Sequence, residues 1–437
     1  MLHHLNNQNY KPILSSEFNW STWAIPKKED GSVDFNKTIT GQPLLDFVNK
    51  QLFPYLQDFK NLAKSSSTIE YKIGEIFSEV RNRIESGFTL RNILDQVDQL
   101  SFLENEDKNE LSSLYEDKIK SMGNAGKDGG QYYTPRPLIR SIVKILSPKI
   151  GETIIDPAVG SAGFLCEAYN FLRKSKELTS QELETLKTRT LYGKEKKSLP
   201  YVIGIMNMIL HDIETPNLIR SNTLSEKISD IEDKDRVDIV LANPPFGGGE
   251  QDHIKSNFPI VTGETAYLFL QHFIKVLKKG GRAGVVIKNS FLSNDDQASK
   301  SLRSQLLQEC NLHTILDLPK VFGTTGVMTV VLFFNKGEPT KKIWYYQLNL
   351  DRNVGKNNPL NNNDLKEFID MSKTQEESKN SWMVNIEDIN NDTWDLTPNN
   401  PNRVEEVDNR TPVEIMAEIE ELDAQAAQAL KTIKELL

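Results

Sequence analysis

Residues 237–250, VDIVLANPPFGGGE, end an apolar run with Asn243, Pro244, Pro245 and Phe246, followed by three glycines. An exocyclic amine on an aromatic ring is a weak nucleophile, because its lone pair is delocalised into the ring. The Asn243 side-chain oxygen and the Pro244 carbonyl are candidate acceptors for hydrogen bonds from such an amine. Prolines fix φ and hold these acceptors in place. The motif therefore predicts electrostatic pre-organisation around a planar amine.

Phe246 supplies a flat ring face on which a planar base can stack. A base in duplex DNA reaches such a pocket only when it is flipped out of the helix. The glycines at positions 247–249 would let the loop move to admit a substrate. The simpler alternative is a turn that ends a strand and buries its phenylalanine.

A second motif, IIDPAVGSAGFLCEA at residues 154–168, places an acid at the end of an apolar run. Ligands of open α/β sheets bind at the carboxyl ends of the strands. Asp156 suits an ammonium group, and Gly160, Ser161, Ala162 and Gly163 let a ligand approach the backbone before a helix begins. The spacing is neither that of a dinucleotide-binding motif nor that of a P-loop. An amino-acid-like ligand fits these residues better than a pyrophosphate does.

Two later strand ends extend this site. Glu195, in LYGKE, can hold the two adjacent hydroxyls of a ribose. Asn222 could meet the exocyclic amine of an adenine, and Leu224 could cover the ring. The alternative for Glu195 is an exposed acid among lysines.

The elements that would position these residues change in type near residue 130. Residues 44–122 follow helical periodicity, including a helix from Ser67 or Thr68 to Gly87, and 123–130 form a glycine-rich link. After the link, short β-rich runs alternate with helical stretches, which predicts βαβ units and a mainly parallel, doubly wound sheet. One such stretch, AYLFLQHFIKVLKKGG, is expected to be a helix that includes Leu277 and is capped by Gly280. Residues 349–410 have weak periodicity, so we expect irregular structure there.

The last segment predicts a long helix. Thr411, Pro412 and Glu414 form a start signal with a capping box. The apolar residues that follow are spaced alternately by four and three, as in a coiled-coil seam. This spacing favours docking on a partner helix, and packing on the chain's own domain is the alternative. The seam residues are Ile415, Ile419, Leu422, Ala426, Ala429, Ile433 and Leu436.

Composition limits the class of protein. The chain has 437 residues, of which 38% are hydrophobic, and its net charge of −9 means that any nucleic-acid binding needs a local basic groove or a basic partner. An acidic enzyme of small substrates is equally compatible with this charge. Only Cys166 and Cys310 are present, and the histidines are scattered, so no metal site is expected. No apolar run or leader indicates a membrane or secretion, so we expect a cytoplasmic protein.

The motif order resembles that of a known family. Asp156-Pro-x-x-Gly160-Ser-x-Gly163 followed by Asn-Pro-Pro-Phe is similar to amino-methyltransferases that use S-adenosylmethionine, in the order found in DNA adenine methylases. The stretch GQYYTPRPLI, residues 130–139, narrows the resemblance to the modification (methylation) subunit of type I restriction-modification systems. LPKVFGTTGVMTVVLFFNKG and the terminal helix are also similar to that subunit, so the resemblance covers nearly the whole chain.

The resemblance implies roles for individual residues. Glu195 would bind the cofactor's ribose, and Ser161, Ala162 and Gly163 would form the loop beside its methionine part. Ala162 stands where many methyltransferases have glycine, and Asn222 stands where an acid often contacts the cofactor's adenine. The residues implied to line the methionine end are Gln131, Tyr132, Tyr133, Thr134, Pro135 and Arg136; those of the catalytic motif are Asn243, Pro244, Pro245 and Phe246.

The resemblance also implies an architecture and partners. The fold would be α/β: a Rossmann-like S-adenosylmethionine-dependent methyltransferase domain at 128–408, after a helical domain at 1–127 and before a coiled-coil-type helix at 409–437. The reaction would be methyl transfer to the N6 amine of adenine in double-stranded DNA. A specificity subunit would read the sequence in a complex with two modification subunits, and a restriction subunit is a further candidate partner.

Two other functions remain open from the residues. The same chemistry could act on a glutamine side chain of a protein or on a guanine of RNA, because Asn-Pro-Pro motifs serve these substrates too. Phe246, the helical leader and the tail seam favour DNA. Alternatively, the chain could bind the cofactor only as an assembly subunit, without catalysis.

Overall fold

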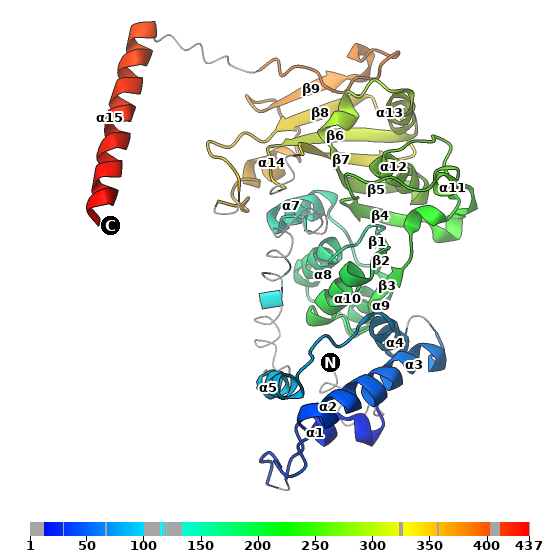
Figure 1. The fold of residues 1–437 in the computed structure, drawn as a ribbon. Helices are drawn as coiled ribbons and strands as arrows, with labels where there is room; N and C mark the ends of the chain where they lie inside the picture. The colour runs from blue at the N-terminus through cyan, green and yellow to red at the C-terminus, as the bar shows by residue number, and fades with distance from the viewer. Residues whose placement is uncertain are drawn as a thin grey trace.

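The structure is a computed structural model of the 437-residue chain. It describes residues 13–28, 30–65, 68–99, 114–115, 117, 119, 133–322, 327–355, 358–402 and 411–436. Within them, helices surround one large sheet, and a layer of helices lies at one end of that sheet (Figure 1).

The sheet has nine strands in the order β3-β2-β1-β4-β5-β7-β6-β8-β9. The five pairs β1–β2, β1–β4, β2–β3, β4–β5 and β6–β8 are parallel, whereas β5–β7, β6–β7 and β8–β9 are antiparallel. The predicted mainly parallel sheet is therefore confirmed. The strands are β1 (Ile154–Asp156), β2 (Leu191–Glu195), β3 (Asn217–Arg220), β4 (Val237–Ala242), β5 (Leu277–Lys288), β6 (Cys310–Leu318), β7 (Thr329–Lys336), β8 (Lys342–Gln347) and β9 (Ser381–Asn385).

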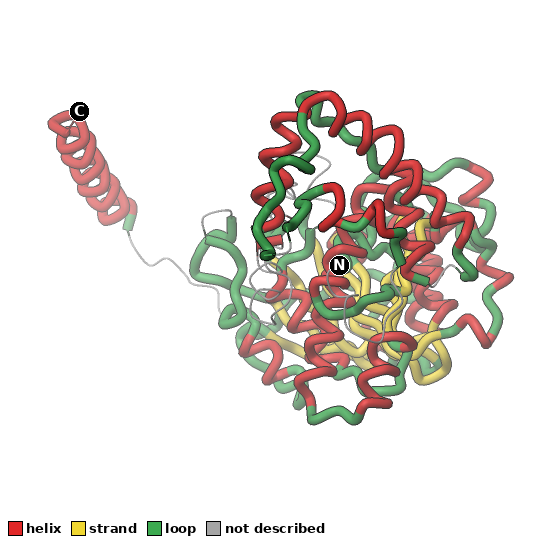
Figure 2. The backbone as a smooth tube through the Cα atoms, turned by 90° about the horizontal axis from the view of Figure 1, so that it is seen from below, coloured by secondary structure: helices red, strands yellow, loops and turns green. Residues whose placement is uncertain are grey.

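Helices cover both faces of the sheet (Figure 2). Successive residues of a strand point to opposite faces. In β4, accordingly, Ile239 and Leu241 belong to one apolar core, and Val240 and Ala242 to the other. The first core is covered by α7 (Arg136–Leu146), α8 (Gly163–Ser175), α9 (Ser180–Arg189), α10 (Ser198–Leu210) and α14 (Lys366–Met371); the second by α11 (Asp252–Lys255), α12 (Thr265–Val276) and α13 (Gln297–Glu309).

The amino-terminal helices have an apolar core of their own, which includes Leu44, Leu56 and Ile73. Thr68 caps α4 as predicted, by accepting a hydrogen bond from the backbone N–H of Tyr71. These helices are α1 (Trp20–Trp23), α2 (Gly41–Phe47), the π-helix η3 (Val48–Leu52), α3 (Phe53–Leu62), α4 (Ile69–Glu79) and α5 (Gly87–Asp98).

The predicted helix end at Gly87 is wrong. Helix α4 stops before Val80, and Gly87 is the first residue of α5. A Cβ at Gly87 would lie 1.8 Å from the carbonyl oxygen of Gly41, so this glycine permits a close backbone contact between α5 and α2. That tertiary contact explains why glycine stands at position 87, and sequence periodicity does not reveal it.

Helix α4 joins the amino-terminal layer to the β3 edge of the sheet (Figure 1). The Lys72 ammonium donates to the carbonyl of Leu218 in β3, and the Glu75 carboxylate accepts from the Tyr201 hydroxyl in α10. Both Lys72 and Glu75 are buried. A buried charge needs such partners, so these contacts hold the layer in a defined place.

Two further predictions need correction. Helix α12 ends at Val276, and Leu277 already pairs with Val237 in the sheet; the left-handed Gly280 lies inside the irregular start of β5 and does not cap the helix. Residues 349–410 are less irregular than expected, because they contain α14 and β9. Aromatic packing stabilises both elements: Phe368 stacks on Trp344, and Trp382 stacks on Tyr345.

The carboxy-terminal helix α15 (Pro412–Leu436) begins with the predicted capping box. Glu414 accepts from the Thr411 backbone at 2.6 Å, and the Thr411 hydroxyl accepts from the Glu414 backbone at 3.3 Å. Its described side chains are exposed, apart from the half-buried Ile415, and α15 stands apart from the sheet in Figure 1. No described helix is both long enough and apolar enough to cross a membrane.

Candidate functional site

The site lies where the strand order reverses, between β1 and β4, at the carboxyl ends of both strands. Ligands of open α/β sheets bind at such a switch point. Asp156 is the last residue of β1, and Asn243 directly follows β4. Two hollows, a smaller and a larger one, open here and share Ala158, Gly160 and Asn243.

The smaller hollow contains a buried carboxyl group, that of Asp156, which is 2% exposed. Burial, opposed by a hydrogen bond from the Ala158 backbone and aided by the nearby Glu195, raises the pKa of Asp156 to about 8. No described lysine, arginine or histidine forms an ion pair with it. A cationic ligand would stabilise the carboxylate, so the position fits the predicted ammonium group.

The loop after β1 approaches its neighbours too closely for larger residues. A Cβ at Gly163 would lie 1.9 Å from a terminal nitrogen of Arg136, at the start of α7. Ala162 is fully buried in a left-handed conformation, with φ of 60°. The side chain of the buried Asn207 in α10 donates to the Ser161 carbonyl at 2.8 Å and so holds the loop in place. A ligand in the smaller hollow would therefore contact backbone held in place on several sides.

Glu195 joins the β2 end to this loop. Its carboxylate accepts hydrogen bonds from the backbone N–H groups of Gly160 at 3.0 Å and Lys197 at 2.8 Å. Burial raises the pKa of Glu195, although these hydrogen bonds oppose the shift. Each carboxylate oxygen keeps further acceptor capacity, which suits two adjacent hydroxyl groups. Glu195 is thus buried in the larger hollow and is not the exposed acid of the alternative interpretation.

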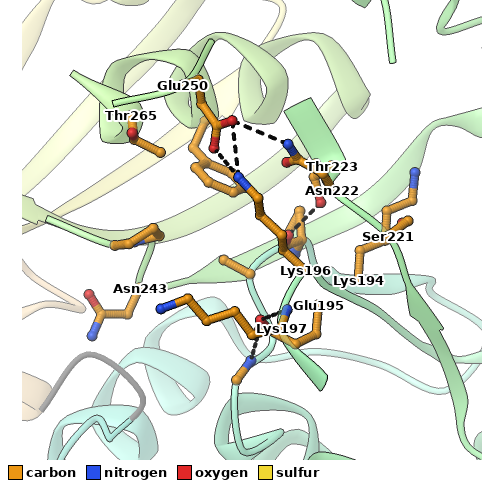
Figure 3. A pocket seen from close by; sticks show the side chains of 15 residues that line it. Lys194, Glu195, Lys196, Lys197, Ser221, Asn222, Thr223, Asn243, Glu250 and Thr265 are labelled. Carbon is orange, nitrogen blue, oxygen red and sulfur yellow. Dashed lines mark hydrogen bonds and ion pairs between the residues drawn. The ribbon is translucent and has the colours of Figure 1, made fainter. Parts of the chain in front are cut away.

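Figure 3 shows the larger hollow, in which the Glu250 carboxylate lies beside Asn222 and Lys196. Asn222 accepts from the Leu224 backbone N–H at 3.2 Å and donates to Glu250 at 3.3 Å. Leu224 itself is fully buried, and it is Phe269 of α12 that lines this hollow. Sequence reasoning missed Glu250 and Phe269. The position of Glu250, four residues after Phe246 in the same loop, was the available signal.

The Asn243 amide is the polar group at the junction of the hollows. Its nitrogen donates to the Thr134 hydroxyl at 2.9 Å. Its oxygen is buried and accepts no hydrogen bond from any residue that the structure describes. A buried acceptor without a donor is unfavourable, so such an atom is expected where a ligand supplies the donor. The contact also joins the NPPF motif to the QYYTPR motif.

The Phe246 ring is half-buried and meets Phe322 edge to face, with ring centroids 5.7 Å apart. It is therefore supported along its edge without being enclosed in the core. The glycines at 247–249 are exposed, and a Cβ at any of them would meet nothing within 4 Å. The glycines themselves therefore contact nothing that would block a movement of the loop, and that movement stays a prediction.

The QYYTPR motif reaches the site in part. Thr134 and Arg136 line the smaller hollow, and Tyr133 and Pro135 are half-buried beside it at the start of α7. Gln131 and Tyr132 lie outside the described residues. Among the described residues, no group of three or more histidine, cysteine, aspartate or glutamate side chains is placed to hold a metal ion.

Together, the residues fit a ligand with an ammonium group and a ribose. The buried carboxyl group of Asp156 lies in the smaller hollow and could bind a cation. Glu195 provides hydrogen-bond acceptors in the adjoining larger hollow. S-adenosylmethionine carries both an ammonium group and a ribose. The Asn243 oxygen lies at the boundary of the two hollows, where a second, planar amine could meet the ligand, whereas Phe246 lines neither hollow.

Comparisons with known proteins agree with this arrangement. Residues 106–410 match the family model described as N-6 DNA Methylase. The chain is 34% identical to the type I restriction enzyme EcoEI methylase subunit of Escherichia coli, over 99% of this chain and 88% of the relative. It is 32% identical to the EcoKI methylase subunit of Escherichia coli K12, over 76% of this chain and 65% of the relative.

Solved structures give the same result. A structure from a study of complex assembly and conformational transition of the type I R-M system has a TM-score of 0.78 and 34% identity, covering 98% of this chain and 88% of the other. A modification subunit of a putative type I restriction enzyme from Vibrio vulnificus has a TM-score of 0.77 and 34% identity, covering 87% of this chain and 81% of the other.

Proposed function

Because this chain belongs to the N-6 DNA methylases, among the methylase subunits of type I restriction enzymes, we propose how its residues methylate adenine. The family reaction is transfer of a methyl group from S-adenosylmethionine to the N6 amine of adenine in DNA. The observation that carries the residue assignment is the buried, unpaired oxygen of Asn243 at the junction of two hollows.

The cofactor supplies a methyl group on a positively charged sulfur. We assign its ammonium group to Asp156 and its ribose to Glu195, with Gly160, Ser161, Ala162 and Gly163 forming the loop beside it. The motif Gln131, Tyr132, Tyr133, Thr134, Pro135 and Arg136 would close the methionine end. Asn222 would belong to the adenine end, where the backbone N–H of the buried Leu224 orients it. Asp156 binds the ammonium group in its ionised form.

The target amine would be held by the catalytic motif. The Asn243 side-chain oxygen and the Pro244 carbonyl accept its two hydrogen bonds, which localises the nitrogen lone pair for attack on the methyl group. Phe246 stacks against the base, while Phe322 supports the ring from its edge. Pro244 and Pro245 fix the backbone that presents both acceptors. Adenine reaches this motif only after flipping out of the duplex.

We further propose the division and partners of the chain. Residues 1–127 form a helical domain, 128–408 the catalytic domain and 409–437 a docking helix. The exposed apolar seam of α15 would dock on a specificity subunit, which recognises the DNA sequence for two modification subunits. That partner would also supply the cations that an acidic chain lacks for phosphate contacts. A restriction subunit would join the same complex, in the cytoplasm where its DNA substrate lies.

The test is a methyl-transfer assay with labelled cofactor on DNA, RNA and protein, with the specificity partner present. We expect label in N6-methyladenine of DNA alone. Transfer to protein or RNA but not to DNA would overturn the proposal, and so would cofactor binding without any transfer.

A further inference from the structure

The larger hollow contains one carboxylate that has no role so far, that of Glu250. Its side chain is 9% exposed. It accepts from the Lys196 ammonium at 2.8 Å and from the Asn222 side-chain nitrogen at 3.3 Å. A carboxylate withdrawn from water needs such partners, so Glu250 is held in a fixed position at the wall of the hollow (Figure 3).

Asn222 has a defined orientation beside it. Its side-chain oxygen accepts from the Leu224 backbone N–H, so its amide nitrogen must face Glu250. The hollow therefore presents a donor, from Asn222, next to an acceptor, from Glu250. A purine that carries an amino group beside an unprotonated ring nitrogen needs this pair.

The other walls suit a flat ring. Phe269 and Pro245 line the hollow on the side of the catalytic loop and α12, and Pro157 and Ala158 line it after β1. Glu195, to which we assign the ribose, lies in the same hollow. A nucleoside held there would place its base among the apolar residues, within reach of Glu250 and Asn222.

We propose that Glu250 accepts a hydrogen bond from the exocyclic amine of the cofactor's adenine, and that Asn222 donates to the adjacent ring nitrogen. The inference rests on the proposed function, because it requires the adenosine part of S-adenosylmethionine in this hollow. It assigns the recognition of that adenine to the Glu250 carboxylate on the catalytic loop, because the Asn222 side chain is uncharged. Cofactor binding then also holds the loop that carries Phe246.

The test compares two ligands by calorimetry on the purified chain: S-adenosylhomocysteine and S-inosylhomocysteine, in which a carbonyl oxygen replaces the amine. The unmodified chain should prefer the adenine ligand by roughly 10- to 100-fold. In Glu250→Gln, the new amide can donate to the carbonyl, so the preference should shrink; any preference that remains is due to Asn222, which cannot donate to the protonated ring nitrogen of the inosine base. In Glu250→Ala the preference should also shrink, because the adenine ligand alone loses a hydrogen bond.

The matched control is Glu226→Gln. Glu226 pairs with Lys194 of β2, also at 2.8 Å, but its side chain is 52% exposed and does not line the hollow. The ligand preference should stay unchanged in this variant. Circular dichroism and thermal unfolding must match between variants, so that altered binding is not altered folding.

An unchanged ligand preference in Glu250→Gln would overturn the inference, whether both affinities fall together or neither does. Equal losses would show that Glu250 only ties the loop to Lys196. If the preference shifts but DNA receives no methyl group, the inference stands and the proposed function fails. If neither ligand binds the unmodified chain, the cofactor assignment and the inference fail together.

Discussion

Asn243 and Asp156 are both polar groups buried without the partner that each would need. Within the described part of the chain, the Asn243 oxygen has no hydrogen-bond donor and the Asp156 carboxyl has no cation beside it. Each deficit is matched by a group of the proposed reactants, an amine in one case and an ammonium in the other. The unfavourable burial of these two polar groups in the free chain is thus the basis for binding.

Cofactor affinity should depend on pH through Asp156. Its pKa of about 8 means that the carboxyl is largely neutral at pH 7, and an ammonium group binds only the ionised form. Binding below pH 8 must therefore release a proton, so affinity rises as pH increases toward 8, by at most roughly tenfold per unit. Calorimetry with S-adenosylhomocysteine between about pH 6 and pH 8.5 measures this slope. Asp156→Asn should bind weakly with no such slope, and a flat profile in the unmodified chain would contradict the assignment.

Ala162 and Gly163 should respond differently to substitution. Ala162→Gly removes a left-handed alanine but adds chain entropy, so the free energy of unfolding should change by about 1 kcal/mol or less, with cofactor binding kept. Gly163→Ala would push away the guanidinium of Arg136, which lines the smaller hollow, and should weaken cofactor binding. Urea unfolding and ligand binding measure both variants. Normal cofactor binding by Gly163→Ala would show that the loop is not fixed as described.

The residue types in the sequence predicted most residues of the site, but not all residues that line its hollows. Asp156, Glu195 and Asn243 carry recognisable chemistry at strand ends, and the structure brings them to one edge of the sheet. Glu250 and Phe269 could not be found that way, because the fold of the glycine loop and the tilt of α12 bring them into the hollow. Leu224 was expected to cover the ligand's ring, but its apolar side chain faces the core.

At the scale of elements, periodicity predicted the sheet and most helices but not where each helix ends. The alternation of strands and helices predicted the doubly wound core. Gly87 and Leu277 were misplaced because a backbone contact with Gly41 and pairing with Val237 decide those boundaries. Both are contacts between distant residues, which local patterns do not contain.

The junction of α4 with α10 should be a measurable source of stability. Tyr201→Phe removes the hydroxyl that the buried Glu75 carboxylate accepts from, leaving that charge poorly satisfied. The free energy of unfolding should fall by about 1–3 kcal/mol in urea titrations. Glu85→Gln, at an exposed carboxylate of the same layer, is the control and should change little. A loss no larger than that of the control would mean that the junction contributes nothing.

At the scale of the whole molecule, the exposed seam of α15 and the acidic net charge indicate a component of a larger assembly. The candidate site belongs to the body of the chain, and α15 stands apart from the sheet (Figure 1), with Ile419 and Leu422 exposed on it. We expect body and tail to have separable roles.

Replacing both Ile419 and Leu422 by glutamate tests this separation. The two side chains are 53% and 56% exposed, so the stability of the body should change by only about 0.5 kcal/mol or less. Copurification with the specificity subunit should be lost, because the seam would carry charge. Glu420→Ala is the control on the same helix. Unimpaired copurification of the double variant would show that the partner docks elsewhere.

The central claim is that the Asn243 oxygen acts on the target amine and not on the cofactor. The most direct measurement is the rate of adenine methylation by Asn243→Ala, with the specificity partner, beside its affinity for S-adenosylhomocysteine. We predict that methylation falls by at least about 100-fold, while ligand affinity stays within about threefold of the unmodified chain, because the lost hydrogen bond exists only with the flipped base. Methylation at the unmodified rate, or a loss of ligand affinity equal to the loss of rate, would contradict the account.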